Sequence, residues 1–128
     1  MNIEHFAINV ADPAAMAAWY VQHLGLRILR ALDVAPFTHF LADSAGRTVV
    51  EIYGHMKAPV PDYRGMDPLV FHIAFSVTDV TGELSRLLAV GASKAGEINV
   101  TSAGDEMTFL RDPWGVALQL VKRAKPLQ

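Results

Sequence analysis

Two pairs of polar residues occupy matched positions in the two halves of the chain. His5 and Glu51 form the first pair, and His72 and Gln119 form the second. The interval between partners is almost the same, 46 residues in the first pair and 47 in the second. Two imidazoles, one carboxylate and one amide oxygen suit a divalent cation that keeps open positions for water or substrate. These residue types predict an exchangeable site for nickel, zinc, cobalt, manganese or iron.

The sequence around these residues is repeated within the chain. EHFAINVAD (residues 4–12) aligns without a gap with FHIAFSVTD (residues 71–79). FLADSAGRTVVEI (residues 40–52) aligns with FLRDPWGVALQL (residues 109–120) when one residue is skipped after the glycine. Two matches at nearly one offset are hard to obtain by chance in 128 residues. We infer an internal duplication.

Each copy is expected to begin with a strand and continue into a capped helix. Residues 5–10 and 72–77 carry β-favouring side chains in alternation. Asp12 and Asp79 follow them as N-cap residues, and Pro13 fits the first helical position. The remaining strands are expected at residues 27–32, 38–42 and 49–53 in the first copy and at 95–100, 107–111 and 117–121 in the second.

The predicted fold class is therefore α+β, with two tandem βαβββ modules in a single domain that spans residues 1–128. Module one is expected at residues 1–56, a linker rich in proline and glycine at 57–68, and module two at 69–125. The length fits one domain, and a hydrophobic fraction of 52% is enough for a buried core.

Alternation along the strands predicts one bulky apolar face and one face of small and polar residues. Glu51 lies on the face opposite Val50 and Ile52, and Gln119 has the same position in the second copy. Buried polar groups cost free energy unless they are paired or bind a metal. A simpler interpretation stays open. In it, His5 and His72 are hydrogen-bonded residues at strand starts, and Glu51 is an exposed carboxylate.

Composition excludes several function classes. The chain has no cysteine, so thiolate chemistry and disulfides are absent. A net charge of −2 without a basic cluster argues against binding of nucleic acid or of an anionic membrane surface. No apolar run approaches the ~20 residues of a membrane span, and the first residues do not form a secretory signal. A cytoplasmic location is expected.

The chain resembles the vicinal oxygen chelate superfamily, which includes glyoxalase I, bleomycin resistance proteins and extradiol dioxygenases. The segments HFAINVAD, WYVQHLGLRI, VVEIYG, FHIAFSVTD and FLRDPWGVALQL carry the resemblance over nearly the whole chain. It implies two modules that pair their sheets into an incomplete barrel around a metal-binding cleft. It also implies that His5, Glu51, His72 and Gln119 are the metal ligands and that the chain forms a homodimer.

The ligand pattern is most similar to that of glyoxalase I. Bacterial glyoxalase I has glutamate where Gln119 stands, and methylmalonyl-CoA epimerase has glutamine in the first copy and glutamate in the second. Extradiol dioxygenases and fosfomycin resistance enzymes need a carboxylate in the second copy, so Gln119 counts against both. Glyoxalase I relatives carry an arginine shortly after the first histidine to bind glutathione, where this chain has AINV with Asn9.

The expected activity is that of a metal-dependent lyase or isomerase that transfers a proton next to a carbonyl through a metal-stabilised enediolate. Glu51 is the expected base, because it is the only carboxylate of the four ligands. The alternatives are a protein that binds and sequesters a small molecule, as antibiotic-resistance members do, and a dioxygenase-like member. Asn9, His39, Tyr53 and Arg111 are weaker candidates for substrate contact, and each is as readily a packing or solvated residue.

Overall fold

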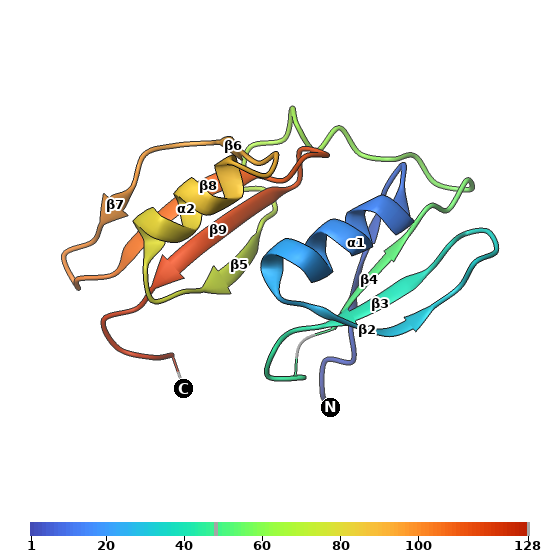
Figure 1. Cartoon of the computed structure of the whole chain (residues 1–128), viewed down its shortest axis with the longest axis horizontal. Coiled ribbons are helices and arrows are strands. Elements are labelled where there is room, and N and C mark those ends of the chain that lie inside the picture. Colours follow the sequence, from blue (N-terminus) through green and yellow to red (C-terminus); the bar gives the residue numbers. More distant parts are fainter. Residues whose placement is uncertain (48, 128) are drawn as a thin grey trace. The chain divides into compact units, whose positions relative to one another are not determined.

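The computed structural model describes residues 1–47 and 49–127. The chain divides into two compact units, the first spanning Met1–Pro61 and the second beginning at Asp62 (Figure 1). The boundary lies inside the segment predicted as the linker. No helix among the described residues is long and apolar enough to cross a membrane.

The first unit is a helix packed on a four-stranded sheet. Its elements are β1 (Phe6–Asn9), α1 (Pro13–Leu24), β2 (Arg27–Ala31), β3 (His39–Ala42) and β4 (Val49–Tyr53). The strand order is β1-β4-β3-β2, with β1 parallel to β4 and the other neighbours antiparallel. The two edge strands are therefore β1 and β2.

Helix α1 begins where the sequence predicts, at Pro13 after the N-cap Asp12. The Asp12 side chain accepts a hydrogen bond from the Ala15 N–H at 3.1 Å, which satisfies one of the free donors of the first turn. Gly25 ends the helix with φ +72°, a conformation that glycine adopts without steric cost. The helix places Met16 and Tyr20, both fully buried, in the core of the first unit.

The second unit repeats this plan. Its elements are β5 (Ile73–Ser76), α2 (Val80–Leu88), β6 (Ser93–Lys94), β7 (Asn99–Val100), β8 (Glu106–Arg111) and β9 (Ala117–Lys122). The sheet order is β5-β9-β8-β6, β7 also pairs with β8, and β5 is parallel to β9. The mixed α+β class and the two modules are confirmed. The pairing of their sheets into an incomplete barrel stays a prediction.

One predicted strand is interrupted. A continuous strand over residues 95–100 is wrong, because β6 and β7 are two short segments that both pair with β8. Gly96, between them, has φ +156°, which side-chain-bearing residues rarely adopt. The chain therefore leaves the ladder and rejoins it, and Thr108 of β8 donates its hydroxyl to the Glu97 carbonyl at 3.3 Å across the gap.

The later part of the predicted linker packs on the second unit. We call residues 62–68 the strap. Tyr63 is buried, and the Arg111 guanidinium donates to the carbonyls of Tyr63 and Met66 at 2.9 and 2.8 Å. A Cβ atom at Gly115 would lie 2.8 Å from the Arg64 Cβ, so the strap approaches this glycine more closely than a side chain allows. The strap is thus an ordered part of the second unit.

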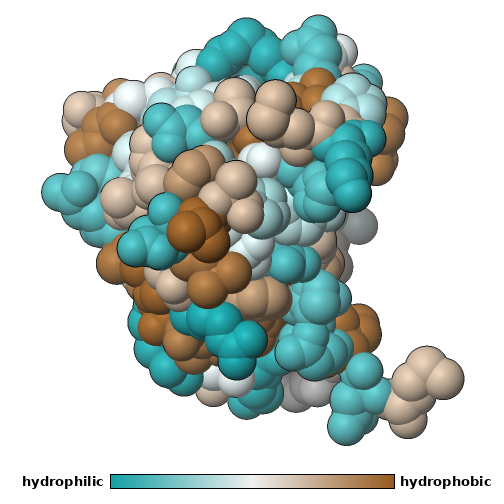
Figure 2. All heavy atoms as spheres, turned by 90° about the vertical axis from the view of Figure 1, so that its right-hand side faces the viewer, coloured by the Kyte–Doolittle hydropathy of each residue, from teal (hydrophilic) through white to brown (hydrophobic). Residues whose placement is uncertain are grey.

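The β2–β3 hairpin exposes hydrophobic residues. Strand β2 is exposed along its whole length. The exposed hydrophobic side chains of the hairpin are Ile28, Leu29, Leu32, Val34 and Phe37. Figure 2 faces the side on which this hairpin turns and shows hydrophobic patches among hydrophilic side chains. An edge strand of this kind is a surface on which another chain can pair.

Candidate functional site

The first unit brings His5 and Glu51 together. His5 immediately precedes β1, and Glu51 lies on the parallel neighbour β4, opposite Ala7. His5 Nε2 is 3.2 Å from Glu51 Oε2. The His5 ring also meets the ring of Phe40 edge-on, with centroids 5.7 Å apart. Strand alternation produces this pairing, because Val50 and Ile52 on either side of Glu51 are buried in the core.

His5 lies between two carboxylates. Its Nδ1 is hydrogen-bonded to Glu4 Oε2, and its Nε2 faces Glu51. The hydrogen bond to Glu4 raises the pKa of His5 above 6.5, the negative charges of Glu4 and Glu51 raise it further, and burial opposes them. When Nδ1 keeps its proton, the Nε2 lone pair faces a carboxylate oxygen, which is unfavourable unless a proton or a cation lies between them.

The second unit places His72 and Gln119 in the same register. His72 precedes β5, and Gln119 lies on β9 opposite Ala74. The His72 ring meets the ring of Phe109 edge-on, with centroids 5.1 Å apart. Its Nδ1 lies 2.8 Å from the Pro68 carbonyl oxygen, and the Gln119 amide donates to Met107 Sδ at 3.7 Å. The duplication therefore repeats the strand position and the ring contact of each histidine, whereas the hydrogen-bond partners of the two differ.

The donor set of each unit fits part of a metal site. Two ligand atoms bound to one ion at roughly 2.1 Å and at a right angle lie about 3 Å apart, which is close to the separation of His5 Nε2 and Glu51 Oε2, 3.2 Å. Among the residues that the structure describes, no three histidine, aspartate or glutamate side chains form a metal-binding group. Each unit supplies one imidazole and one oxygen donor, and the four-ligand site stays a prediction.

Asn9 organises the turn after β4. Its side-chain amide donates to the carbonyls of His55, Ala58 and Pro59 at 3.1, 3.1 and 3.3 Å, and its oxygen accepts from the His55 N–H at 2.6 Å. These contacts give Asn9 a structural role that requires no bound ligand. Its role in substrate contact stays a prediction.

The other weak candidates also have partners within their own unit. His39 Nδ1 is hydrogen-bonded to the Phe37 carbonyl at 2.7 Å. The Tyr53 ring lies edge-on to His55, with centroids 6.1 Å apart. Arg111 donates to the Gly115 carbonyl at 3.1 Å in addition to its two bonds to the strap. The guanidinium of Arg111 thus has a structural function, and its contact with substrate stays a prediction.

Four groups next to the site were not predicted from the sequence. Glu4 and the Pro68 carbonyl bind the Nδ1 atoms of the two histidines, and Phe40 and Phe109 contact the imidazole rings. The phenylalanines could have been found, because they occupy matched positions in the repeat. The Pro68 carbonyl could not, since a backbone group leaves no mark on residue type.

The fold and the matched pairs define a family. The family model described as "Glyoxalase/Bleomycin resistance protein/Dioxygenase superfamily" matches residues 2–120. The chain belongs to this superfamily, as the repeated segments suggested. A search of curated proteins found no match.

Solved structures agree with this membership. A glyoxalase family protein from Bacillus cereus is similar with a TM-score of 0.81 at 17% identity, covering 98% of this chain and 95% of that chain. A glyoxalase family protein from Enterococcus faecalis gives a TM-score of 0.67 at 28% identity, covering 94% and 97%. TnmS3, an antibiotic binding protein from Streptomyces sp. CB03234, gives 0.72 at 17% identity, covering 97% of each chain. At 17% identity the likeness shows the fold alone.

Proposed function

We propose that the chain is a metal-dependent lyase or isomerase of the glyoxalase type that acts in the cytoplasm. The observation that supports this best is the approach of His5 Nε2 to Glu51 Oε2 at 3.2 Å, together with His72 and Gln119 at the matched positions of the second unit. The four residues would hold one divalent ion, which is nickel, zinc, cobalt, manganese or iron.

The proposed chemistry is proton transfer at a carbon next to a carbonyl. When bound, the ion would stabilise the negative charge that develops on the substrate oxygen. Glu51 would take the carbon-bound proton at its carboxylate and return it to the neighbouring carbon. Gln119 cannot serve as a base, because an amide does not accept a proton near neutral pH. The edge-on rings of Phe40 and Phe109 would keep the two imidazoles from turning.

Two successive measurements, of metal content and then of turnover, test this function. The purified chain is dialysed against each metal, and its bound metal is counted. Turnover of methylglyoxal hemithioacetal is then measured with and without chelator. We expect one ion per chain and chelator-sensitive turnover. Glu51→Gln should lower kcat by about 10²-fold or more, whereas Glu97→Gln, a control at a side chain that is 90% exposed, should not. Full turnover by Glu51→Gln with metal bound would contradict the role of Glu51.

A second candidate function is the binding and sequestration of a small molecule. The second unit has a groove of about 570 Å³ between β5, β9 and the C-terminal segment, a size suited to a drug-like ligand. Phe75, Val77 and Leu127 are among its apolar lining residues, and Lys122 and Arg123, each ion-paired with a carboxylate, are among its polar ones. Antibiotic binding by the similarly folded TnmS3 makes this a real alternative. Tight ligand binding without turnover, unchanged by chelator, would favour it.

We also propose a homodimer. The exposed hydrophobic β2–β3 hairpin supports it, because burying such side chains against another copy removes apolar surface from water. The proposed partners are thus a second copy of the chain and a small-molecule substrate.

A further inference from the structure

The hydrogen bond of His72 determines which of its nitrogens can bind a metal. Its Nδ1 lies 2.8 Å from the Pro68 carbonyl oxygen. A carbonyl can only accept, so Nδ1 carries the proton and donates it. In the neutral imidazole the lone pair is then on Nε2. The Pro68 carbonyl therefore selects one tautomer of His72.

Arg111 holds the segment that carries this carbonyl. Its Nη1 donates to the Tyr63 and Gly115 carbonyls at 2.9 and 3.1 Å, and its Nη2 donates to the Met66 carbonyl at 2.8 Å. The Arg111 guanidinium thus binds two carbonyls of the strap and one carbonyl of the turn between β8 and β9, and so links the two segments. Hydrogen bonds from a charged donor are shorter and stronger than neutral ones. Pro68 follows Met66 by two residues, so its position depends on this anchor.

The turn between β8 and β9 contributes two further contacts. Arg64 donates from Nη2 to the Pro113 carbonyl at 3.0 Å. Gly115, with φ +95°, lets the strap backbone approach so closely that a Cβ atom would lie 2.9 Å from the Arg64 nitrogen and 3.0 Å from its Cα. The strap is therefore fixed to the second unit by side-chain bonds and by close packing.

The described residues of the first unit orient their histidine differently. The repeat places Ala42 where the second copy has Arg111, and the Nδ1 partner of His5 is the Glu4 side chain. The two histidines occupy matched positions but are oriented by different groups. His5 thus serves as an internal control for any change made at Arg111.

We propose that Arg111 is a positioning residue that holds the strap so that the Pro68 carbonyl fixes His72 as the Nδ1–H tautomer and leaves Nε2 as the donor toward the metal. The part that concerns metal rests on the proposed function, whereas the tautomer of His72 does not. The proposal assigns Arg111 to the support of a ligand in place of direct contact with substrate. Groups that orient a ligand histidine typically affect metal affinity about 10–100-fold.

Nitrogen NMR of the metal-free full-length chain tests the tautomer directly. We expect His72 in the wild type to be protonated at Nδ1 only. Arg111→Met should give a mixture of tautomers at His72 and leave the signals of His5 unchanged, and Arg111→Lys should restore the wild-type pattern in part. Metal affinity, measured by calorimetry, should fall about 10–100-fold in Arg111→Met. An unchanged tautomer and unchanged affinity in a folded Arg111→Met chain would overturn the proposal.

A matched pair of glycine variants covers the case in which Arg111→Met does not fold. Gly115→Ala adds a methyl group against the strap, whereas a Cβ atom at Gly46, at the equivalent turn of the first unit, would lie 3.1 Å from Arg27 Nη2, the far end of a flexible side chain. Both glycines have positive φ, +95° and +71°, so both variants carry backbone strain, and the readout that separates them is the His72 tautomer. Gly115→Ala should disturb the His72 tautomer and Gly46→Ala should not. Equal effects of the two variants on the His72 tautomer would contradict the proposed role of the strap in fixing it.

The two proposals fail in different ways. A wild-type chain that binds no metal, combined with a tautomer change in Arg111→Met, would reject the metal-dependent function and support the positioning role. A wild-type chain that binds metal, combined with no change at His72 in the variants, would support the function and reject the positioning role of Arg111.

Discussion

Glu51 and Gln119 occupy matched positions in the two sheets and differ in that one is a carboxylate and the other an amide. Both lie opposite an alanine on a parallel neighbouring strand, Ala7 in the first unit and Ala74 in the second. The carboxylate lies 3.2 Å from a histidine nitrogen, whereas the amide donates to Met107 Sδ. The duplication has thus kept the positions of these residues and changed their charge. The proposed base, Glu51, therefore belongs to the first unit.

Gln119→Glu should tighten the binding of a divalent cation. A second carboxylate adds a negative charge to the proposed site, and a gain of about tenfold corresponds to about 1.4 kcal/mol. Calorimetric titration with nickel or zinc measures this gain. Glu106→Gln, at an ion pair with Lys122 elsewhere in the second unit, is the control and should leave affinity unchanged. Equal affinity of Gln119→Glu and the wild type would remove Gln119 from the ligand set.

Asp112→Ala should destabilise the second unit. The Asp112 side chain is buried and accepts from the N–H groups of Trp114 and Val116, both at 2.9 Å. Leaving two donors without this acceptor should lower the free energy of unfolding by about 2–4 kcal/mol. Asp43→Ala is the matched control at the equivalent turn of the first unit, where the half-buried side chain accepts a hydrogen bond from the Arg47 N–H at 2.9 Å. Urea denaturation compares the two, and a smaller loss for Asp112→Ala would contradict this account.

Residue type and repeated spacing predicted the four site candidates, but not the groups around them. His5 and Glu51 could be paired in advance because strand alternation and the duplication both constrain them. The bonds of Arg111 join residues 45 and 48 positions apart in the chain, and their acceptors are backbone carbonyls. No local pattern marks such a contact, so Arg111 was predicted only as a weak candidate for substrate contact, as readily a packing or solvated residue.

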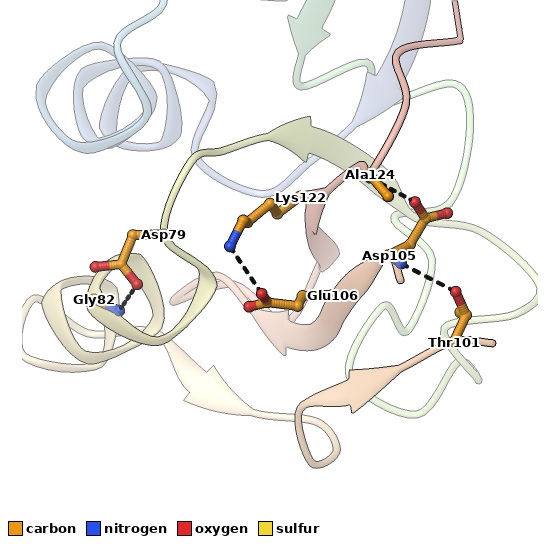
Figure 3. A network of polar contacts seen from close by, with 7 residues as sticks. All are labelled: Asp79, Gly82, Thr101, Asp105, Glu106, Lys122 and Ala124. Carbon is orange, nitrogen blue, oxygen red and sulfur yellow. Dashed lines mark hydrogen bonds and ion pairs between the residues drawn. The ribbon is translucent and has the colours of Figure 1, made fainter. Parts of the chain in front are cut away.

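At the scale of elements, the caps and strands were more predictable than the edge of the second sheet. Asp12 and Asp79 cap their helices in the same way, through bonds to Ala15 and Gly82. The edge of the second sheet is broken into the two short strands β6 and β7. Beside it, polar contacts join Glu106 of β8 to Lys122 of β9 and hold Asp105 just before β8 (Figure 3). The Asp105 carboxylate accepts a hydrogen bond from the Ala124 N–H at 2.9 Å and forms an ion pair with Arg123 at 2.7 Å.

The Asp105 contacts predict a loss of stability in acid. The hydrogen bond from the Ala124 N–H, followed by that from Arg123, holds the pKa of Asp105 below its ordinary value of 3.8. A lowered pKa means that Asp105 contributes its full stability above pH 3.8 and loses it as the pH falls through the lower folded-state value. Asp105→Asn should therefore be less stable than the wild type at neutral pH, and the difference should shrink below pH 3.8.

Urea midpoints of the wild type and Asp105→Asn, measured from neutral pH into acid, check this window. Glu97→Gln is the control, since its side chain is 90% exposed and pairs only loosely with Lys94, at 3.4 Å. Its midpoint should follow the wild type across the whole range. A difference between Asp105→Asn and the wild type that does not change with pH would contradict the assigned direction of the pKa.

At the scale of the whole molecule, the repeated sequence accounts for the two units. The duplicated segments predicted two βαβββ modules, and the structure has them in two compact units. The strap was expected to be part of a linker, because proline and glycine mark it in the sequence. Burial of Tyr63 and the bonds of Arg111 attach it to the second unit. Those contacts depend on the folded turn and could not be read from composition.

The proposed homodimer predicts a response at the exposed hairpin. Leu29, on β2, is 48% exposed, and replacing it with glutamate puts a charge on an apolar edge strand. Leu29→Glu should weaken self-association about tenfold or more. Val100→Glu is the matched control on an edge strand of the second unit, at a side chain 65% exposed. Sedimentation equilibrium compares them, and a monomeric wild type at all concentrations would reject the dimer.

The most direct measurement is a metal titration of the wild type, His5→Ala and His72→Ala. We propose that one ion is held jointly by His5 of the first unit and His72 of the second. This proposal predicts one ion per wild-type chain and a loss of affinity of at least about 100-fold in each variant, because each removes one of the four proposed ligands. Absence of binding in the wild type, or undiminished binding in either variant, would contradict it.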